Sequence, residues 1–159
     1  MLRRLADGMY GPLLIVWLGS LWVVGYLVVP QLFTLLPDRV LAGRIAGELL
    51  RLTACLGLIL APVVLGLLWC QACDAGERLP VWIVLAVLAI GFGHLLALSL
   101  LQPEMAAMKA EAAPLDVMHS PLRERFSRWH GVASGIYLVQ SLVAVALAIR
   151  CGGRRTAQP

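Results

Sequence analysis

The chain has 159 residues, of which 60% are hydrophobic and 14% are charged, and its mean hydropathy is +0.85. A soluble domain must cover itself with more polar surface than this composition supplies, so an ordinary water-soluble globular fold is excluded. The formal net charge of +4 is typical of basic residues that flank membrane helices and meet anionic headgroups. We therefore expect the lipid bilayer as the surrounding medium, and the sequence has no nucleic-acid-binding pattern.

The first long apolar run contains no charged residue from Leu13 to Leu36. A helix rises ~1.5 Å per residue, so this run is long enough to cross the ~30 Å hydrocarbon layer. Arg3 and Arg4 precede it, as in a signal peptide. However, the run is too long for the apolar part of a signal peptide, and no small-x-small cleavage site ends it. We expect a retained first transmembrane helix over about 11–36.

Three further apolar runs predict helices over about 39–72, 80–102 and 126–149. Asp38 is the expected N-cap of the second helix, and Pro103 is expected to end the third. The mixed segment 104–125 predicts short interfacial helical pieces, and 151–159 predicts a disordered tail. Short connections favour antiparallel neighbours. The predicted fold is all-α: one integral membrane domain over 1–159, an antiparallel bundle of four transmembrane helices.

Two stretches in the first part of the chain carry a family resemblance. They are Trp17-x-Gly19 through Gly25-Tyr26-x-x-x-Pro30-x-Leu32-Phe33, and Ala42-Gly43-x-x-Ala46-Gly47. Together they resemble the signature of the transmembrane protein 205-like family, which includes a bacterial domain of unknown function. The second half of the family signature is resembled by two later stretches, Pro103-Glu104-Met105 and Phe126-x-x-Trp129-His130-Gly131-x-x-Ser134. The resemblance implies a four-helix protein of the bacterial inner membrane, in a family without an agreed biochemical activity. A thinner likeness to copper-resistance and haem-synthesis membrane proteins supplies an alternative.

The orientation of the bundle rests on the placement of its basic residues. Four crossings put both termini on one side, with six basic residues there and seven on the other side, so the positive-inside rule does not decide. Arg3 and Arg4 directly precede the first inserted helix, and acidic residues accompany several of the opposing arginines. We expect the termini in the cytoplasm.

His94 and His130 are candidate ligands of haem b or copper. By helical rise, His94 lies ~14 Å inside the bilayer from Pro103, and His130 opens the fourth helix from the same side. Two imidazoles on facing helices could ligate a metal through their neutral nitrogens. The alternative is a buried histidine that hydrogen-bonds to Ser134, Tyr137 or a backbone carbonyl. No third ligand has an obvious spacing, so we expect no cofactor, with haem b or copper as the alternative.

Small and hydroxyl-bearing residues predict how the helices pack. His130, Ser134, Tyr137 and Ser141 fall within ~60° on the helical wheel and form one polar stripe. Hydroxyls and glycines hold helices together in lipid, at ~0.6–2 kcal/mol per hydrogen bond, and this interpretation is favoured over a functional cavity. The predicted packing residues are Gly19, Gly43, Gly47, Gly131, Ser134 and Gly135.

The helix ends opposite the termini gather further polar residues. We call this set the polar mouth, and its members are Gln31, Arg44, Glu48, Arg51, Glu104, Arg128 and His130. Antiparallel geometry brings these ends to one membrane face, where they could bind a headgroup, an ion or a partner's loop. The alternative is that the charges pair among themselves.

Cys70-x-x-Cys73 ends the second helix on the side of the termini. The spacing fits a redox pair or a thiolate metal site. No thioredoxin-like alternation of strands and helices surrounds it, so redox or metal function is a minor alternative.

The sequence contains no complete catalytic constellation, which favours a non-enzymatic protein. The main hypothesis is an accessory or interaction subunit that docks onto another membrane protein or onto itself as a homo-oligomer. The competing hypothesis is a haem- or copper-handling protein that uses His94 and His130. Transport of a small solute is disfavoured, because a lone four-helix bundle offers little room for a gated path and no inverted repeat is evident.

Overall fold

A computed structural model describes residues 2–113 and 115–153, and within these residues the chain forms helices and short connections without a strand. Four continuous helical segments are long and apolar enough to cross a membrane: Met9–Leu35, Arg39–Asp74, Val81–Ala112 and Arg123–Arg150. The predicted all-α fold with four membrane-spanning helices is confirmed.

The first span consists of α1 (Leu2–Trp22), a π-helical turn η1 (Val23–Val28) and α2 (Val29–Leu35), and the second is α3 (Arg39–Asp74). The third consists of α4 (Val81–Leu96), a π-helical turn η2 (Ala97–Leu101) and α5 (Gln102–Ala112). A 3₁₀ turn η3 (Val117–His119) leads to α6 (Arg123–Gly153), which is the fourth span.

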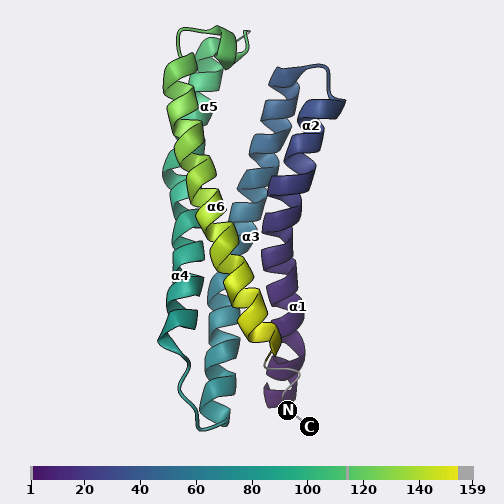
Figure 1. Cartoon of the computed structure of the whole chain (residues 1–159), viewed down its shortest axis with the longest axis vertical. Helices are drawn as coiled ribbons and strands as arrows, with labels where there is room; N and C mark the ends of the chain where they lie inside the picture. The colour runs from purple at the N-terminus through teal and green to yellow at the C-terminus, as the bar shows by residue number, and fades with distance from the viewer. Residues whose placement is uncertain (1, 114, 154–159) are drawn as a thin grey trace.

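Consecutive spans run in opposite directions along the long axis of the molecule (Figure 1). The start of α1 and the end of α6 lie at one end of the bundle, together with the connection between α3 and α4. The α2–α3 and α5–α6 connections lie at the other end. Because α1 packs on α3, α3 on α4, α4 on α6 and α6 on α1, the four spans enclose one core.

The surface of the bundle is as apolar as its core. Ile15 is 69% exposed and Val81 71%, and no span has more than 39% of its most apolar window buried. The core itself is built from side chains such as Trp17, Leu21 and Leu147, which are 0% exposed. An exposed apolar surface this extensive needs lipid around it, so the chain is a multi-pass membrane protein.

Asp38 is the N-cap of α3, as the sequence predicts. Its carboxylate accepts hydrogen bonds from the backbone N–H groups of Val40, at 2.8 Å, and Leu41, at 3.1 Å. These bonds satisfy donors that have no partner inside the first helical turn. The cap therefore fixes the point at which the chain re-enters the bundle.

The third helix continues beyond its predicted end. Proline lacks the N–H of the i→i−4 bond, and its ring crowds the preceding turn, so Pro103 was expected to stop the helix. Instead, the wider π-helical turn η2 precedes Pro103, and η1 precedes Pro30 in the same way. A π turn is a known place where a helix absorbs such a disruption.

The other helix bounds differ in detail from the expectation. The helix through Pro103 reaches Ala112, so half of the predicted interfacial segment 104–125 is regular helix and only η3 is a short piece. The helix α1 begins at Leu2 rather than near residue 11, and α6 begins at Arg123 rather than at 126. Of the predicted tail, residues 151–153 belong to α6, and 154–159 lie outside the described residues.

Candidate functional site

His94 lies where all four spans meet, and its side chain is buried, with 3% of its surface exposed. The indole Nε1–H of Trp17, from α1, donates to Nε2 of His94 across 3.3 Å. From α6, the amide nitrogen of Gln140 lies 3.4 Å from Nδ1 of the same ring. Gly57 of α3 lies directly against the ring. We call Trp17, Gly57, His94 and Gln140 the His94 cluster.

Two glycines make this cluster possible. A Cβ atom at Gly57 would lie less than 3.0 Å from Cδ2 and Nε2 of His94, which is closer than real Cβ atoms approach. A Cβ atom at Gly93 would lie 2.6 Å from the side-chain amide of Gln140. In these two places the absence of a side chain is what allows a polar ring and a polar amide to fit between the helices.

The hydrogen bonds around His94 favour a neutral imidazole. Because the indole of Trp17 donates to Nε2, a neutral ring carries its proton on Nδ1. The amide nitrogen of Gln140 also donates to the carbonyl of Ile90 across 2.9 Å, and this bond orients the amide. In that tautomer Nδ1–H faces a nitrogen that is itself a donor, so the 3.4 Å approach of Gln140 is a packing contact. A doubly protonated ring would also lose the bond from Trp17, because Nε2 could no longer accept it.

A second group of polar contacts joins the π-helical turn η1 to α6. Tyr26 donates its hydroxyl hydrogen to Oγ of Ser141 across 3.0 Å, and the hydroxyl of Tyr137 donates to the carbonyl of Leu21. A Cβ atom at Gly25 would lie less than 3.0 Å from the Tyr137 ring, so Gly25 admits the phenol. Like the His94 cluster, these contacts hold helices together.

The structure does not bring His94 and His130 together. His130 is exposed and stacks on Phe126, with ring centroids 6.0 Å apart. Because Gln140 lies level with His94, His130 is displaced by ten residues of helix, or ~15 Å along the axis. Two imidazoles at this separation do not fit one haem iron or one copper ion, since ligating nitrogens lie ~2 Å from a metal. Among the described residues, no group of three or more His, Cys, Asp or Glu side chains could hold a metal ion.

Most of the glycines predicted at helix contacts make no close contact with a neighbouring helix of this chain. No atom lies within 4 Å of a Cβ placed at Gly19, Gly47, Gly131 or Gly135. At Gly43 such an atom would make ordinary contact, 3.7 Å from Nζ of Lys109. The close approaches occur at Gly25, Gly57 and Gly93 instead.

The predicted polar stripe of the fourth helix splits into two faces. Tyr137 and Ser141 take part in contacts inside the bundle, and Ser141 is 1% exposed. His130 and Ser134 lie on the exposed side of α6. The reason is that α6 crosses the bundle obliquely, so its inward face changes along its length (Figure 1).

The charges of the polar mouth pair mostly within their own helices. Arg51 binds Glu48 within α3 across 2.9 Å, and Arg128 binds Glu124 within α6 across 3.0 Å. Both pairs are well exposed, and such pairs contribute about 0–1 kcal/mol. Gln31 is exposed and accepts a hydrogen bond from Thr34 within α2. These residues do not converge on one site.

Two residues, Arg125 and Lys109, make contacts between helices at the polar-mouth end of the bundle. Arg125 of α6 binds Glu104 of α5 across 3.3 Å. The ammonium group of Lys109 donates to the carbonyl of Gly43 across 3.0 Å and lies 5.7 Å from the centroid of the Phe126 ring. Lys109 thereby ties α5 to both α3 and α6. Arg44 is exposed.

Cys70 and Cys73 lie one turn apart near the end of α3, and both are exposed free thiols. They are at the opposite end of the bundle from the polar mouth. A redox or metal-binding role for the pair remains a prediction.

Sequence reasoning missed two of the polar partners that matter most. The partners of His94 are Trp17 and Gln140, rather than the Ser134 or Tyr137 that we expected. Gln140 had a usable signal, because it is the only amide side chain in the apolar part of the fourth span. Trp17 and Gly57 had none, since an indole and a glycine are common in any apolar helix.

A family model described as a domain of unknown function, DUF4149, matches residues 13–114. The match covers most of the first span and all of the second and third, and it includes every member of the His94 cluster except Gln140. Comparison with curated proteins gives no match, and comparison with solved structures gives none either.

Proposed function

This chain belongs to the DUF4149 family, and we propose that it is a non-catalytic membrane protein that serves as an accessory or interaction subunit. The observation that carries the proposal is the exposed side of α6. Gly131 and Gly135 lie one turn apart there, with no atom within 4 Å of an added Cβ, and Ser134 is exposed beside them. We call these three residues the α6 outer face.

Glycines at this spacing let two helix backbones approach closely in lipid, where packing and hydrogen bonds drive association. A serine on the same face adds a hydroxyl that can bond to a carbonyl of the neighbouring helix. Because no atom of the described residues fills the space beside these glycines, the partner is a transmembrane helix of a second copy or of another membrane protein.

The interior of the bundle supports a structural use of its polar groups. Trp17 of α1 donates to His94 of α4, and Gln140 of α6 contacts the same ring and donates to the carbonyl of Ile90. Beside them, Tyr26 donates to Ser141 and Tyr137 donates to the carbonyl of Leu21. Among the described residues, no buried side-chain nitrogen or oxygen atom lacks a hydrogen-bond partner. A haem or copper function through His94 and His130 has no supporting contact among the described residues.

The proposal is tested by purification in a mild detergent followed by mass measurement on a sizing column. We expect the unmodified chain to elute with a second copy or another protein. A Gly131→Leu/Gly135→Leu variant should elute alone, because two leucines keep the helices apart. The matched control is Gly66→Leu, at another exposed membrane glycine with no atom within 4 Å of an added Cβ. A monodisperse monomer from the unmodified chain would contradict the proposal.

We also propose that the protein resides in a bacterial inner membrane with its termini in the cytoplasm. Arg3 and Arg4 next to the first span support this orientation.

A further inference from the structure

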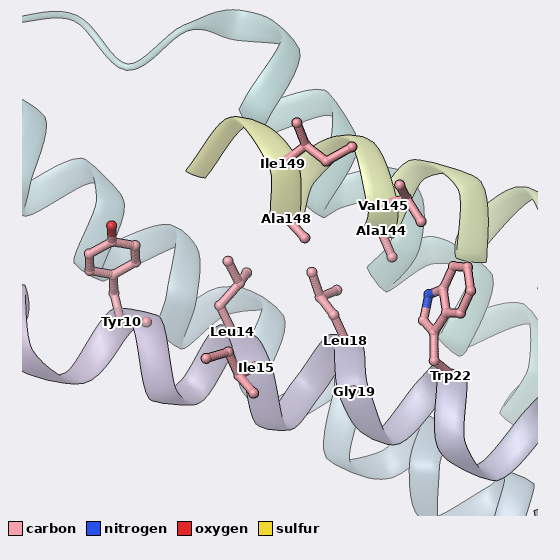
Figure 2. Close-up of a pocket in the computed structure, with 11 residues that line it drawn as sticks. Tyr10, Leu14, Ile15, Leu18, Gly19, Trp22, Ala144, Val145, Ala148 and Ile149 are labelled. Carbon is pink, nitrogen blue, oxygen red and sulfur yellow. The ribbon is translucent and has the colours of Figure 1, made fainter. Parts of the chain in front are cut away.

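A groove runs between α1 and α6 at the end of the bundle where the chain begins and ends. Its volume is about 430 Å³, and it is open to the surrounding lipid. Figure 2 shows Leu14 and Leu18 of α1 directed towards Ala144 and Ala148 of α6, with the indole of Trp22 at one end. The lining is apolar, and small residues keep the two helices from filling the space themselves.

The size of the groove distinguishes between possible occupants. From Tyr10 to Trp22 the helix rises ~18 Å, so a volume of about 430 Å³ corresponds to a mean cross-section of ~24 Å². A helix with its side chains is at least ~10 Å wide and has a cross-section of ~80 Å². The groove therefore has room along its length for a single extended hydrocarbon chain, whereas a transmembrane helix would lie over it and could place only side chains inside.

The length of the groove also fits one leaflet of a bilayer. The hydrocarbon core is ~30 Å thick, so one leaflet contributes ~15 Å. The groove is of similar length and begins near the membrane surface on the side of the termini. An acyl chain that entered from that leaflet would reach Trp22 with its far end.

One basic residue, Arg150, adjoins the end of the groove near the membrane surface. Arg150 is exposed, follows the lining residue Ile149, and lies with its guanidinium 6.0 Å from the centroid of the Trp82 ring. Basic residues at headgroup depth attract anionic lipids.

We propose that this groove binds one acyl chain of an anionic phospholipid from the leaflet on the side of the termini, with the headgroup next to Arg150. The site is separate from the α6 outer face, which lies on the other half of the helix. The lipid is thus a bound component of the protein, in addition to being its solvent.

Two substitutions fill the groove. Gly19 lines it, and no atom lies within 4 Å of an added Cβ, so Gly19→Leu places a side chain in the space of the acyl chain without a clash. Ala148 is exposed on the opposite wall, and Ala148→Leu does the same from α6. If one variant fails to fold, the other keeps the test valid. Gly66→Leu is the control outside the groove.

The test is native mass spectrometry of the detergent-solubilised chain with added phosphatidylglycerol or phosphatidylcholine. We expect the unmodified chain and Gly66→Leu to retain one phosphatidylglycerol. Retention should fall about tenfold in Gly19→Leu and in Ala148→Leu, because the contacts along the acyl chain are lost. Arg150→Gln should reduce the preference for phosphatidylglycerol over phosphatidylcholine about fivefold, since one basic residue near the headgroup is removed.

Several outcomes would overturn this inference. Equal retention of phosphatidylglycerol by the unmodified chain, Gly66→Leu, Gly19→Leu and Ala148→Leu would place the lipid outside the groove. No retention by the unmodified chain would show that the protein binds no such lipid. Equal retention of both lipids by the unmodified chain would refute recognition of an anionic headgroup. A second copy that dissociates in Gly19→Leu would identify a protein occupant. None of these results depends on the Gly131→Leu/Gly135→Leu variant, so the two proposals fail separately.

Discussion

Replacing Gly57 by alanine tests the His94 cluster with the smallest possible change. The added Cβ would lie less than 3.0 Å from two atoms of the His94 ring, so the ring must move away and lose its hydrogen bond to Trp17. Overpacking of this kind costs about 1–3 kcal/mol. The lost hydrogen bond adds about 0.6–1.7 kcal/mol in a membrane protein.

One effect acts in the opposite direction. Alanine is about 0.8–1 kcal/mol more favourable than glycine inside a helix. The net expectation for Gly57→Ala is therefore a free energy of unfolding lower by about 2 kcal/mol. Gly66→Ala carries the same gain in helix propensity without a clash, so it should be neutral or slightly stabilising.

The assay is unfolding of the purified chain in mixed micelles by increasing the fraction of sodium dodecyl sulfate, followed by tryptophan fluorescence and helical circular dichroism. A His94→Ala background removes the ring that the new methyl group meets, so Gly57→Ala should lose most of its cost there. The reasoning fails if Gly57→Ala is as stable as Gly66→Ala, or if its cost is unchanged without the imidazole.

Three further substitutions probe the contacts between spans in the same titration. Gln140→Leu should lower the free energy of unfolding by about 1 kcal/mol, because the carbonyl of Ile90 loses the donor of its side-chain hydrogen bond. Unchanged stability would show that the amide contributes nothing. Gly25→Ala should lower the free energy of unfolding by about 1–3 kcal/mol, because the added Cβ meets the ring of Tyr137. If the loss is as large in a Tyr137→Ala background, this cause is contradicted. Lys109→Met should lower the free energy of unfolding by about 1 kcal/mol. It should also speed amide hydrogen exchange at the start of α3, where Lys109 binds the carbonyl of Gly43. An unchanged exchange rate there would count against that contact.

The membrane spans could be predicted from the sequence because the signal is long and simple. About 20 apolar residues must follow one another to cross the hydrocarbon layer, and four runs do so. Asp38 could also be predicted as an N-cap, since the chemistry of that position is local. The continuation through Pro103 could not, because the π-helical turn that accommodates the ring has no distinct residue pattern.

The packing residues show the limit of spacing as a guide. The Gly131-x-x-x-Gly135 pair looks like a contact motif, yet within this chain it faces outward. Gly57 belongs to no such pair but lies at the tightest contact with His94. Which face of a helix points inward depends on the tilt and rotation of that helix, and these are set by all its neighbours together.

The partners of His94 illustrate the same point for polar groups. Burial of an imidazole in an apolar helix predicts that a hydrogen-bond partner exists, and this inference holds. It does not say which partner, because Trp17 is 77 residues away in the sequence and α1 meets α4 only in the folded bundle.

Labelling with a membrane-impermeant maleimide in sealed, oriented vesicles tests most directly whether the chain crosses the bilayer four times in alternating directions. Cys70 and Cys73 are exposed at the end of α3, and a variant without Cys55 and Cys151 keeps these two thiols alone. A Ser120→Cys variant in which all four native cysteines are replaced places a single thiol in the connection between α5 and α6. We expect the two positions to react from opposite sides of the membrane, and both to react once the vesicles are permeabilised. Labelling of both positions from the same side of sealed vesicles, or release of the protein from membranes by alkaline carbonate, would contradict the four-span bundle.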